Sequence, residues 1–317
     1  MGCGDFNSFP LLPALLRTIY FGTGLPKVSG PHPGYSNGRY EMNRLRQAVH
    51  ENGGRTLLGA AVYFYDPVFL EICAHLGYQA IWIEMEHGHI TFAQAADLCR
   101  MAAGTGMLTM IRIPDVQRAN VLRAAECGPD ILDVPMIERP EQMQELRTYA
   151  RFAPEGSRGY FSVSRAINYG ISGGVVARQQ SLNTDLCLMA QIESKAAMSR
   201  LDELAAVPDV DLFIGPADLA ASLDVPSETS HPKVRAAATA IAKTARAHLK
   251  CVATACAPDE YGFWLGLGID LLFCTNDTAC LKQAAGELLS QARGILQRRA
   301  DAGVEALTAS DGIRDDG

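Results

Sequence analysis

Four short polar motifs each follow an apolar run, and together they contain the residue types of an enzyme site. They are Trp82-Ile-Glu-Met-Glu-His-Gly-His89, Met110-Ile-Arg-Ile-Pro114, Gln191-Ile-Glu-Ser194 and Ile214-Gly-Pro-Ala-Asp-Leu219. If the runs are parallel strands of one barrel, a histidine, an arginine and two carboxylates gather at its carboxyl-end rim, where the active sites of such barrels lie. The pattern predicts an enzyme.

Glu193 and Asp218 are the candidate metal ligands. Carboxylate oxygens at strand ends suit a hard cation such as Mg²⁺ or Mn²⁺, although two carboxylates taken alone fit helix capping or a surface pair equally well. Gln191 precedes Glu193 by two residues and therefore faces the same way along a strand. It is either a substrate contact or a buried amide bonded to the backbone.

Arg112 and His87 are the candidate catalytic residues. A guanidinium that closes an apolar strand is costly unless an anion accompanies it, and that anion is either a bound oxo-acid or a neighbouring carboxylate. His87 stands at a strand end between Glu86 and Gly88, a good place for proton transfer. Trp82 on the same run either lines the pocket or packs between barrel and helices.

Between its two ends the chain alternates short apolar runs with longer helical stretches, which is typical of repeated βα units in a (β/α)8 TIM barrel. Right-handed crossovers would close such a series. We predict strands at 57–62, 80–84, 108–112, 130–134, 187–192, 211–214, 250–255 and 270–274. The predicted helices are 66–76, 92–103, 117–126, 139–150, 195–205, 231–248, 258–266 and 277–299.

The ends of the chain and one internal segment depart from this alternation. Residues 1–41 are expected to form a peripheral or disordered tail, 42–300 a single barrel domain and 301–317 a polar tail. The segment 155–185 is rich in Gly, Ser and Arg, and we expect a loop over the active-site mouth.

Composition limits the class of protein and of partner. The chain has 317 residues, of which 48% are hydrophobic and 20% charged, as in an ordinary soluble globular protein. A net charge of -7 argues against nucleic acid as the partner. The nine cysteines include no C-x-x-C pair, which predicts reduced thiols in a cytoplasmic protein. No apolar stretch is long and continuous enough to predict a membrane span.

Six ordered motifs resemble the HpcH/HpaI aldolases over roughly residues 45–295. They are Glu86-His-Gly88, Arg112-Ile-Pro114, Pro135-Met136, Pro154-Glu-Gly-Ser-Arg-Gly159, Gln191-Ile-Glu-Ser194 and Gly215-Pro-Ala-Asp-Leu219. The resemblance implies a class II pyruvate aldolase with a divalent metal, Mg²⁺, Mn²⁺ or Co²⁺, built as a (β/α)8 barrel of the phosphoenolpyruvate/pyruvate type. It also implies a homo-oligomer, usually a hexamer assembled as a trimer of dimers.

The resemblance assigns a role to each matching position. Glu193 and Asp218 correspond to the metal ligands, Arg112 to the residue that steadies the enolate, and His87 to the general base. An acid fourteen residues after the arginine supports that histidine in the family, and here the position is Glu126. The expected contacts to a small 2-oxo acid substrate are Gln191, Gly215, Pro216, Ala217 and Arg112, with Trp82 as the further candidate lining residue.

Three acidic positions depart from the family pattern. Glu84 and Glu126 stand where aspartate is usual, and Asp133 stands where an apolar residue is usual. A carboxylate inside a barrel strand must be paired, protonated or exposed to water. These departures keep open a condensing or decarboxylating enzyme acting on oxaloacetate as the alternative to an aldolase. A non-catalytic ligand-binding barrel is a further alternative, which would be expected to lack the metal carboxylates or Arg112.

Overall fold

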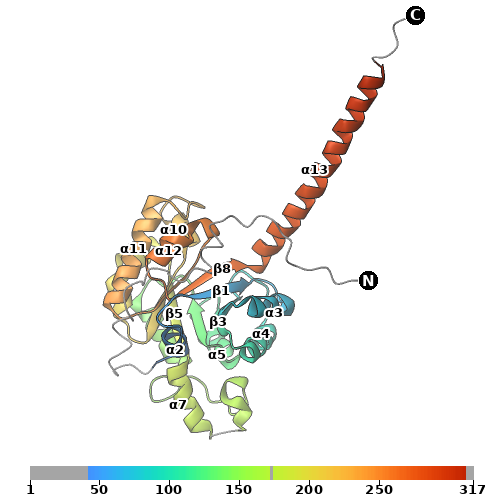
Figure 1. Cartoon of the computed structure of the whole chain (residues 1–317). Helices are drawn as coiled ribbons and strands as arrows, with labels where there is room; N and C mark the ends of the chain where they lie inside the picture. Colours follow the sequence, from blue (N-terminus) through green and yellow to red (C-terminus); the bar gives the residue numbers. More distant parts are fainter. Residues whose placement is uncertain (1–41, 172–173, 312–317) are drawn as a thin grey trace, which may run out of the picture.

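Eight parallel strands close into one barrel, as the alternation predicts. The computed structural model describes residues 42–171 and 174–311, with side chains through residue 301. The strands are hydrogen-bonded in chain order, and β8 pairs with β1 to complete the ring (Figure 1). They are β1 (Leu57–Val62), β2 (Ala80–Glu84), β3 (Leu108–Arg112), β4 (Ile131–Val134), β5 (Cys187–Ile192), β6 (Val210–Ile214), β7 (Val252–Ala255) and β8 (Leu271–Asn276).

Helices connect the strands along the outside of the barrel, while α2 precedes β1 and α13 follows β8. They are α2 (Arg44–Glu51), α3 (Pro67–Leu76), α4 (Phe92–Thr105), α5 (Arg118–Glu126), α6 (Pro140–Ala150), η1 (Arg165–Gly170), α7 (Val175–Asp185), α8 (Lys195–Ser199), α9 (Leu201–Ala206), α10 (Pro216–Ser222), α11 (Pro232–Ala247), η2 (Pro258–Glu260), α12 (Tyr261–Gly266) and α13 (Asp277–Asp311). The predicted helix at 195–205 is divided into α8 and α9.

Local sequence sets where these helices begin and end. The Asp66 side chain accepts a hydrogen bond from the Phe69 N–H at 3.0 Å, and Pro67 occupies the first turn of α3. Gly77 ends α3 with a φ of 91°, a left-handed conformation that glycine adopts without strain.

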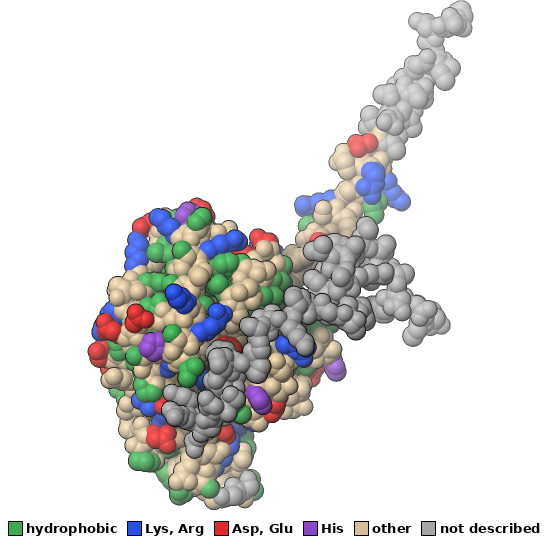
Figure 2. Space-filling view, turned by 60° about the vertical axis from the view of Figure 1, so that its left-hand side comes forward, with side chains coloured by type: hydrophobic (Ala, Val, Ile, Leu, Met, Phe, Trp, Pro, Cys, Tyr) green, Lys and Arg blue, Asp and Glu red, His purple; other side chains and the backbone are tan. Residues whose placement is uncertain are grey.

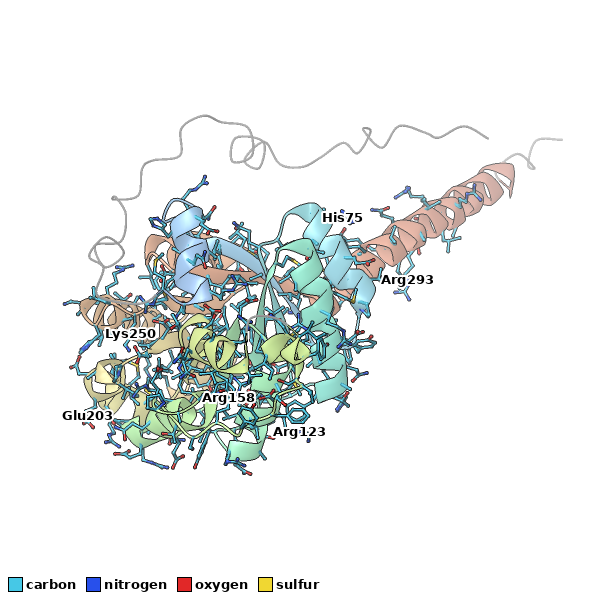
Figure 3. All side chains as sticks on the ribbon, turned by 90° about the horizontal axis from the view of Figure 1, so that it is seen from below. His75, Arg123, Arg158, Glu203, Lys250 and Arg293 are labelled. Atoms are coloured by element: carbon cyan, nitrogen blue, oxygen red, sulfur yellow. The ribbon has the colours of Figure 1, made fainter. Side chains whose placement is uncertain are left out.

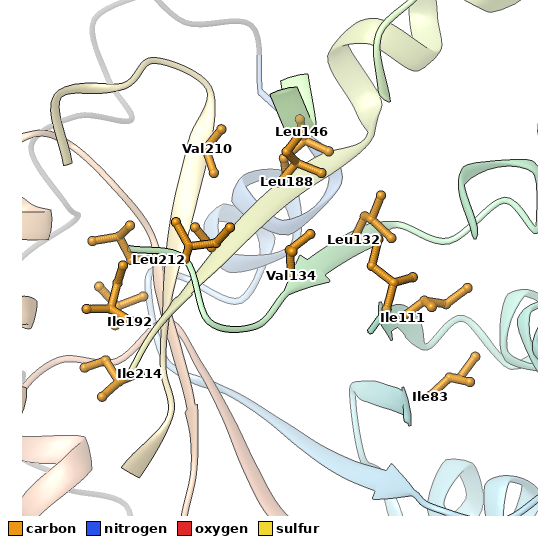
Figure 4. Close-up of a cluster of buried hydrophobic side chains, with 14 of the residues drawn as sticks. Ile83, Ile111, Leu132, Val134, Leu146, Leu188, Ile192, Val210, Leu212 and Ile214 are labelled. Atoms are coloured by element: carbon orange, nitrogen blue, oxygen red, sulfur yellow. The ribbon is translucent and has the colours of Figure 1, made fainter. Parts of the chain in front are cut away.

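The strands have an outer and an inner apolar face. The outer face packs against the helices, and its members include Ile83, Ile111, Leu132 and Leu188 (Figure 4). Alternate residues point into the barrel, where the rings of Trp82, Phe213 and Phe273 lie together. The centroid of the Trp82 ring is 5.4 Å from that of each phenylalanine. This aromatic layer fills the barrel below the carboxyl-end rim.

The segment 155–185 does not form the predicted loop over the mouth. It contains η1 and α7 and packs beside the amino end of β4. The Arg165 guanidinium donates to the carbonyl oxygens of Cys127 and Gly128, at 3.1 and 2.9 Å, just before that strand begins. The expectation was wrong because a glycine- and serine-rich composition does not indicate at which end of a barrel a segment packs.

Helix α13 leaves the barrel at the end of β8 and projects away from it (Figure 1). Its 35 residues span about 50 Å, and the boundary predicted at residue 300 falls inside it. Hydrophobic and basic side chains stand on its projecting part (Figure 2). The exposed large hydrophobic side chains along it are Leu281, Leu288, Leu289, Ile295 and Leu296. The predicted tail at residues 1–41 lies outside the described residues.

No helix in the described part of the chain combines the length and the apolar character that a bilayer crossing requires.

Candidate active site

The Arg112 guanidinium lies buried at the rim, between two carboxylates and an aromatic ring. Its Nε is 2.6 Å from Oε2 of Glu84, and its Nη1 is 3.2 Å from Oε2 of Glu86. Its Cζ stands 4.7 Å from the centroid of the Trp82 ring. We expected either a bound oxo-acid or a neighbouring carboxylate as the anion beside Arg112, and the chain itself supplies the carboxylates of Glu84 and Glu86. The ring below and the carboxylates beside it fix the guanidinium in place.

The turn after β2 presents His87 at the mouth of the barrel. Oε1 of Glu84 accepts hydrogen bonds from the N–H groups of Glu86 and His87, at 2.7 and 2.8 Å. A Cβ at Gly88 would lie 2.7 Å from the Glu84 carbonyl oxygen, so the turn requires glycine there. The His87 side chain is 68% exposed, with Nε2 3.6 Å from Oε2 of Glu86. His87 is therefore free to meet a ligand from solvent.

Glu193 lies just past β5, and hydrogen bonds hold both of its carboxylate oxygens. Oε1 accepts from the Met136 N–H and Oε2 from Nε2 of Gln191, each at 2.7 Å. The Oε1 atom of Gln191 in turn lies 3.5 Å from Nη1 of Arg112. A Cβ on Gly215 would overlap Oε2 of Glu193 and approach the Gln191 amide nitrogen to 2.7 Å. Gly215 thus leaves room for the carboxylate.

The charges at this rim favour a bound cation. The pKa of Glu193 is raised to about 7, chiefly by burial; the carboxylates of Asp218 and Glu86 add to this rise, and the Met136 N–H and Arg112 oppose it. Burial also raises the pKa of Glu86. Asp218 is exposed in the first turn of α10, the helix that follows β6, and β6 is the neighbour of β5 in the barrel. A positive ion would relieve this repulsion.

The donor chemistry of Glu193 and Asp218 fits a hard divalent cation that completes its coordination with water or substrate oxygens. No cluster of three or more His, Cys, Asp or Glu side chains suited to a metal occurs in the described ranges. Two carboxylates together with a chelating substrate are a sufficient set for Mg²⁺ or Mn²⁺, because these ions keep several non-protein ligands. The pair therefore remains our prediction for the metal site.

Asp133 is completely buried within β4, and neither of its carboxylate oxygens has a hydrogen-bond partner among the residues that the structure describes. It pairs in register with Arg112, whose guanidinium is turned to Glu84 and Glu86 instead. Burial raises the pKa of Asp133 well above its ordinary value, with Arg112 opposing and the nearby carboxylates adding to the shift. Of the three states considered for a carboxylate in a barrel strand, the protonated one fits this environment.

Glu126 and His87 are not brought together within one copy of the chain. Helix α5 runs back from the carboxyl end of β3 toward the amino end of β4, and Glu126 is its last residue. Its carboxylate accepts hydrogen bonds from the Arg158 guanidinium, at 3.2 and 2.9 Å. The acid beside His87 is Glu86, the next residue along the chain. The predicted pairing of His87 with Glu126 is therefore not formed within one chain.

Trp82 points into the barrel and packs in its inner aromatic layer, so the alternative that it packs between barrel and helices is wrong. Tyr63 meets its ring edge-on, with the centroids 6.3 Å apart. Burial raises the pKa of Tyr63; the positive charge of Arg112 opposes this rise and the negative charge of Glu84 adds to it. The backbone N–H of Tyr63 donates to Asp277 at 2.9 Å, and the Phe64 N–H donates to the same oxygen at 3.0 Å.

Two residues at this rim were not assigned a role by the motifs. Glu86 connects Arg112 with His87, and its position inside the Glu86-His-Gly88 string was the available signal. Met136 turns its N–H to Glu193 through a left-handed backbone, with a φ of 53°. Nothing in the Pro135-Met136 string indicated that conformation, since methionine rarely adopts it.

Known proteins match this chain over the central part of its sequence, which forms most of the barrel. A sequence model described as HpcH/HpaI aldolase/citrate lyase matches residues 62–257. The chain is 31% identical over 196 residues to the hydroxypyruvate/pyruvate aldolase of Sagittula stellata, covering 62% of this chain and 76% of that protein. It is 32% identical over 223 residues to the 2-keto-3-deoxy-L-rhamnonate aldolase of Escherichia coli K12, covering 69% of this chain and 82% of that protein.

A solved structure gives the same result in three dimensions. An HpcH/HpaI aldolase/citrate lyase family protein of Burkholderia cenocepacia J2315 superposes with a TM-score of 0.73 at 26% identity. The superposition covers 79% of this chain and 100% of that one. The range matched by the sequence model contains every candidate site residue, from Trp82 to Asp218.

Proposed function

Because the chain belongs to the HpcH/HpaI aldolase/citrate lyase family, we propose that it is a divalent-metal-dependent aldolase that cleaves or forms a 4-hydroxy-2-oxo acid. The products of cleavage are pyruvate and an aldehyde. The observation that carries the proposal is the hydrogen-bonded connection at the rim from Glu193 through Gln191 to Arg112. This connection links Glu193, a candidate metal ligand, to the Arg112 guanidinium, which would stabilise an enolate.

Glu193 and Asp218 would hold the divalent cation, Mg²⁺, Mn²⁺ or Co²⁺. The bound ion would supply Lewis-acid polarisation of the 2-oxo group, so that a lysine Schiff base is not required. Gly215 and Pro216 shape the floor beside Glu193, and the first-turn N–H groups near Ala217 have no partners within α10. These amides are suited to the substrate carboxylate.

In the cleavage direction, His87 would take the proton from the 4-hydroxyl group. The C3–C4 bond then breaks, the new carbonyl leaves as the aldehyde, and the bond's electron pair forms the enolate of pyruvate. The Arg112 guanidinium, fixed by Glu84 and Trp82, stabilises the enolate's negative charge. A proton delivered to C3 completes pyruvate. Gln191 would orient the substrate from beside Arg112.

The substrate class is supported by the names of the relatives. Hydroxypyruvate, pyruvate and a 2-keto-3-deoxy acid share a 2-oxo acid group, and the rim offers a cation site and a guanidinium for such a group. We therefore propose a small-molecule 2-oxo acid substrate of the pyruvate class.

We also propose that the chain acts as a homo-oligomer, with the hexamer of the family resemblance as the expected form. The exposed apolar residues of α13 leave this helix without a hydrophobic partner in the described part of one copy. Helix α3 carries a second exposed apolar row, Val68, Ile72 and Leu76, spaced four residues apart. Size-exclusion chromatography with light scattering tests the proposal, and a monomer at micromolar concentration would contradict it.

Pyruvate release from a panel of substrates tests the catalytic proposal. The chelated protein is assayed with several 4-hydroxy-2-oxo acids and with oxaloacetate, before and after Mg²⁺, Mn²⁺ or Co²⁺ is restored. Metal-restored release from a hydroxy-oxo acid is the expected result. Release from oxaloacetate alone would favour the decarboxylating or condensing alternative, and an inactive protein throughout would contradict the enzyme proposal.

A further inference from the structure

A cavity of about 580 Å³ lies at the amino end of the barrel, away from the rim that holds Arg112 and Glu193. It opens beside the starts of β5, β6 and β7 and is separate from every residue of the proposed reaction. In Figure 3, Lys250 at this end lies on the side of the barrel away from Arg293 of α13. The lining residues that matter here are Arg46, Arg151, Asp209, Asp211 and Lys250.

Two of these lining residues are buried cations. Arg151 is only 5% exposed and Lys250 only 6%. The Arg151 Nη1 donates to the Leu186 carbonyl oxygen at 2.8 Å and approaches that of Leu182 at 3.5 Å, while Nζ of Lys250 donates to the Val207 carbonyl oxygen. Among the described residues, neither Arg151 nor Lys250 forms an ion pair with a carboxylate.

Buried cations without a counter-charge are costly, because a backbone carbonyl replaces only part of the lost hydration. Burial lowers the pKa of both Arg151 and Lys250, which reflects that cost. A guanidinium has five N–H donors and an ammonium three, so carbonyl oxygens use only some of them. Both groups retain capacity for an acceptor in the cavity.

Three acids line the cavity: Asp211 is buried and already engaged, whereas Asp209 and Glu155 lie at its exposed edge. Asp211 pairs with Arg46 and accepts from the Cys251 N–H at 2.8 Å. Asp209 is exposed and pairs with Arg147 at 2.9 Å. The inner wall therefore has an excess of positive charge.

We propose that this cavity is a binding site for a small oxyanion, a carboxylate or a phosphate, held by Arg151 and Lys250. The planar fork of Arg151 matches two oxygens of either group, and the Lys250 ammonium supplies a compact second charge. The site is distinct from the proposed catalytic centre and does not depend on it. The shared chemistry of the ligand is its negatively charged oxygens.

Isothermal titration calorimetry on the full chain tests the proposal with two probes, inorganic phosphate and citrate. Each titration is run at constant ionic strength set with chloride, so that nonspecific screening is matched. We expect saturable binding of one anion per chain, and the tighter probe identifies phosphate or carboxylate as the natural group. Absence of saturable binding for both probes would overturn the proposal.

Charge variants locate the site. Lys250→Met keeps most of the side-chain length and is expected to weaken anion binding at least tenfold, whereas Lys250→Arg should retain it. Lys243→Met is the matched control, because it removes an exposed positive charge outside the cavity lining. Equal losses in Lys250→Met and Lys243→Met would indicate diffuse surface charge and would refute the site.

A second variant keeps the test independent of the folding of Lys250→Met. Ala206 is exposed and lines the same cavity, so Ala206→Glu adds a carboxylate without disturbing a buried contact. We expect it to weaken anion binding by about tenfold or more through repulsion. Wild-type affinity in Ala206→Glu would contradict the proposal. Neither readout depends on catalytic activity, so failure here leaves the aldolase proposal unaffected.

Discussion

The two ends of this barrel have opposite charge excesses. At the carboxyl-end rim, Arg112 is surrounded by Glu84, Glu86 and Asp133, and burial raises the pKa of Glu193 nearby. At the amino end, Arg151 and Lys250 are buried against backbone carbonyls. The same fold therefore carries buried acids at the end where we propose a cation site and buried cations at the end where we propose an anion site. A site with an excess of buried negative charge favours a positive ligand, and a site with an excess of buried positive charge favours a negative one.

The largest expected effect is the loss of metal-dependent activity at one end of the barrel without loss of anion binding at the other. Glu193→Gln and Asp218→Asn should each lower metal-dependent pyruvate release by more than about a hundredfold, because each removes a ligand charge. Anion binding at the amino end should be unchanged in both. Lys250→Met should show the reverse. Calorimetry with Mn²⁺ and with phosphate measures both properties, and circular dichroism checks the fold.

Loss of both ligand affinities in one of these variants would contradict the comparison, since it would indicate that the ends are not independent. Full metal-dependent activity in both carboxylate variants would refute the metal assignment.

His87→Ala tests the division of labour within the rim. Removing a general base costs about a hundredfold to ten-thousandfold in rate. We expect that loss in cleavage of a 4-hydroxy-2-oxo acid, but a much smaller loss in exchange of the pyruvate methyl protons with D₂O. NMR measures the exchange and a coupled assay measures the cleavage. Equal losses in both reactions would show that His87 acts on the enolate as well.

Gly215→Ala tests whether the shape of the rim, and not only its charge, is needed. The added methyl group would displace the Glu193 carboxylate, and such misplacement costs about a hundredfold in rate. Gly262→Ala is the matched control, because a Cβ there meets no atom within 4 Å. Its activity should stay within about twofold of wild type. Steady-state rates at saturating metal decide the point.

Asp133→Asn tests whether the rim's excess of acids is a burden on stability. A raised pKa in the folded state means that the stability present below the ordinary carboxyl pKa is lost as pH rises. The variant cannot ionise, so its advantage over wild type should grow with pH by up to about 1.4 kcal/mol per unit. Urea unfolding at pH 5 and pH 8 measures this. An advantage that is constant with pH would show that Asp133 is not protonated.

The strand positions, and the placement of most candidate site residues at the rim, could be predicted because they depend on short, local patterns. Apolar runs of four to six residues reproduce all eight strands to within two residues at each end. Glu193, Asp218 and Arg112 follow those runs directly, so placing the strands also places them at the rim. The family assignment was confirmed by the match over residues 62–257.

Contacts between distant elements could not be read from the same patterns. Glu126 was assigned by counting from Arg112, yet the direction of its helix carries it toward the far end, where Arg158 binds it. The pairing of Arg112 with Glu84, and the cavity beside Lys250, arise only when separate strands and loops are packed together. Sequence spacing contains no record of those partners.

Helix α13 has its base at the carboxyl-end rim. Its first residue, Asp277, is buried and holds the backbone of Tyr63 and Phe64, and Tyr63 rests against the tryptophan that supports Arg112. A force on the projecting helix would therefore reach the Arg112 guanidinium through one carboxylate and two rings. The helix is a lever arm about 50 Å long with its fulcrum beside the proposed active site.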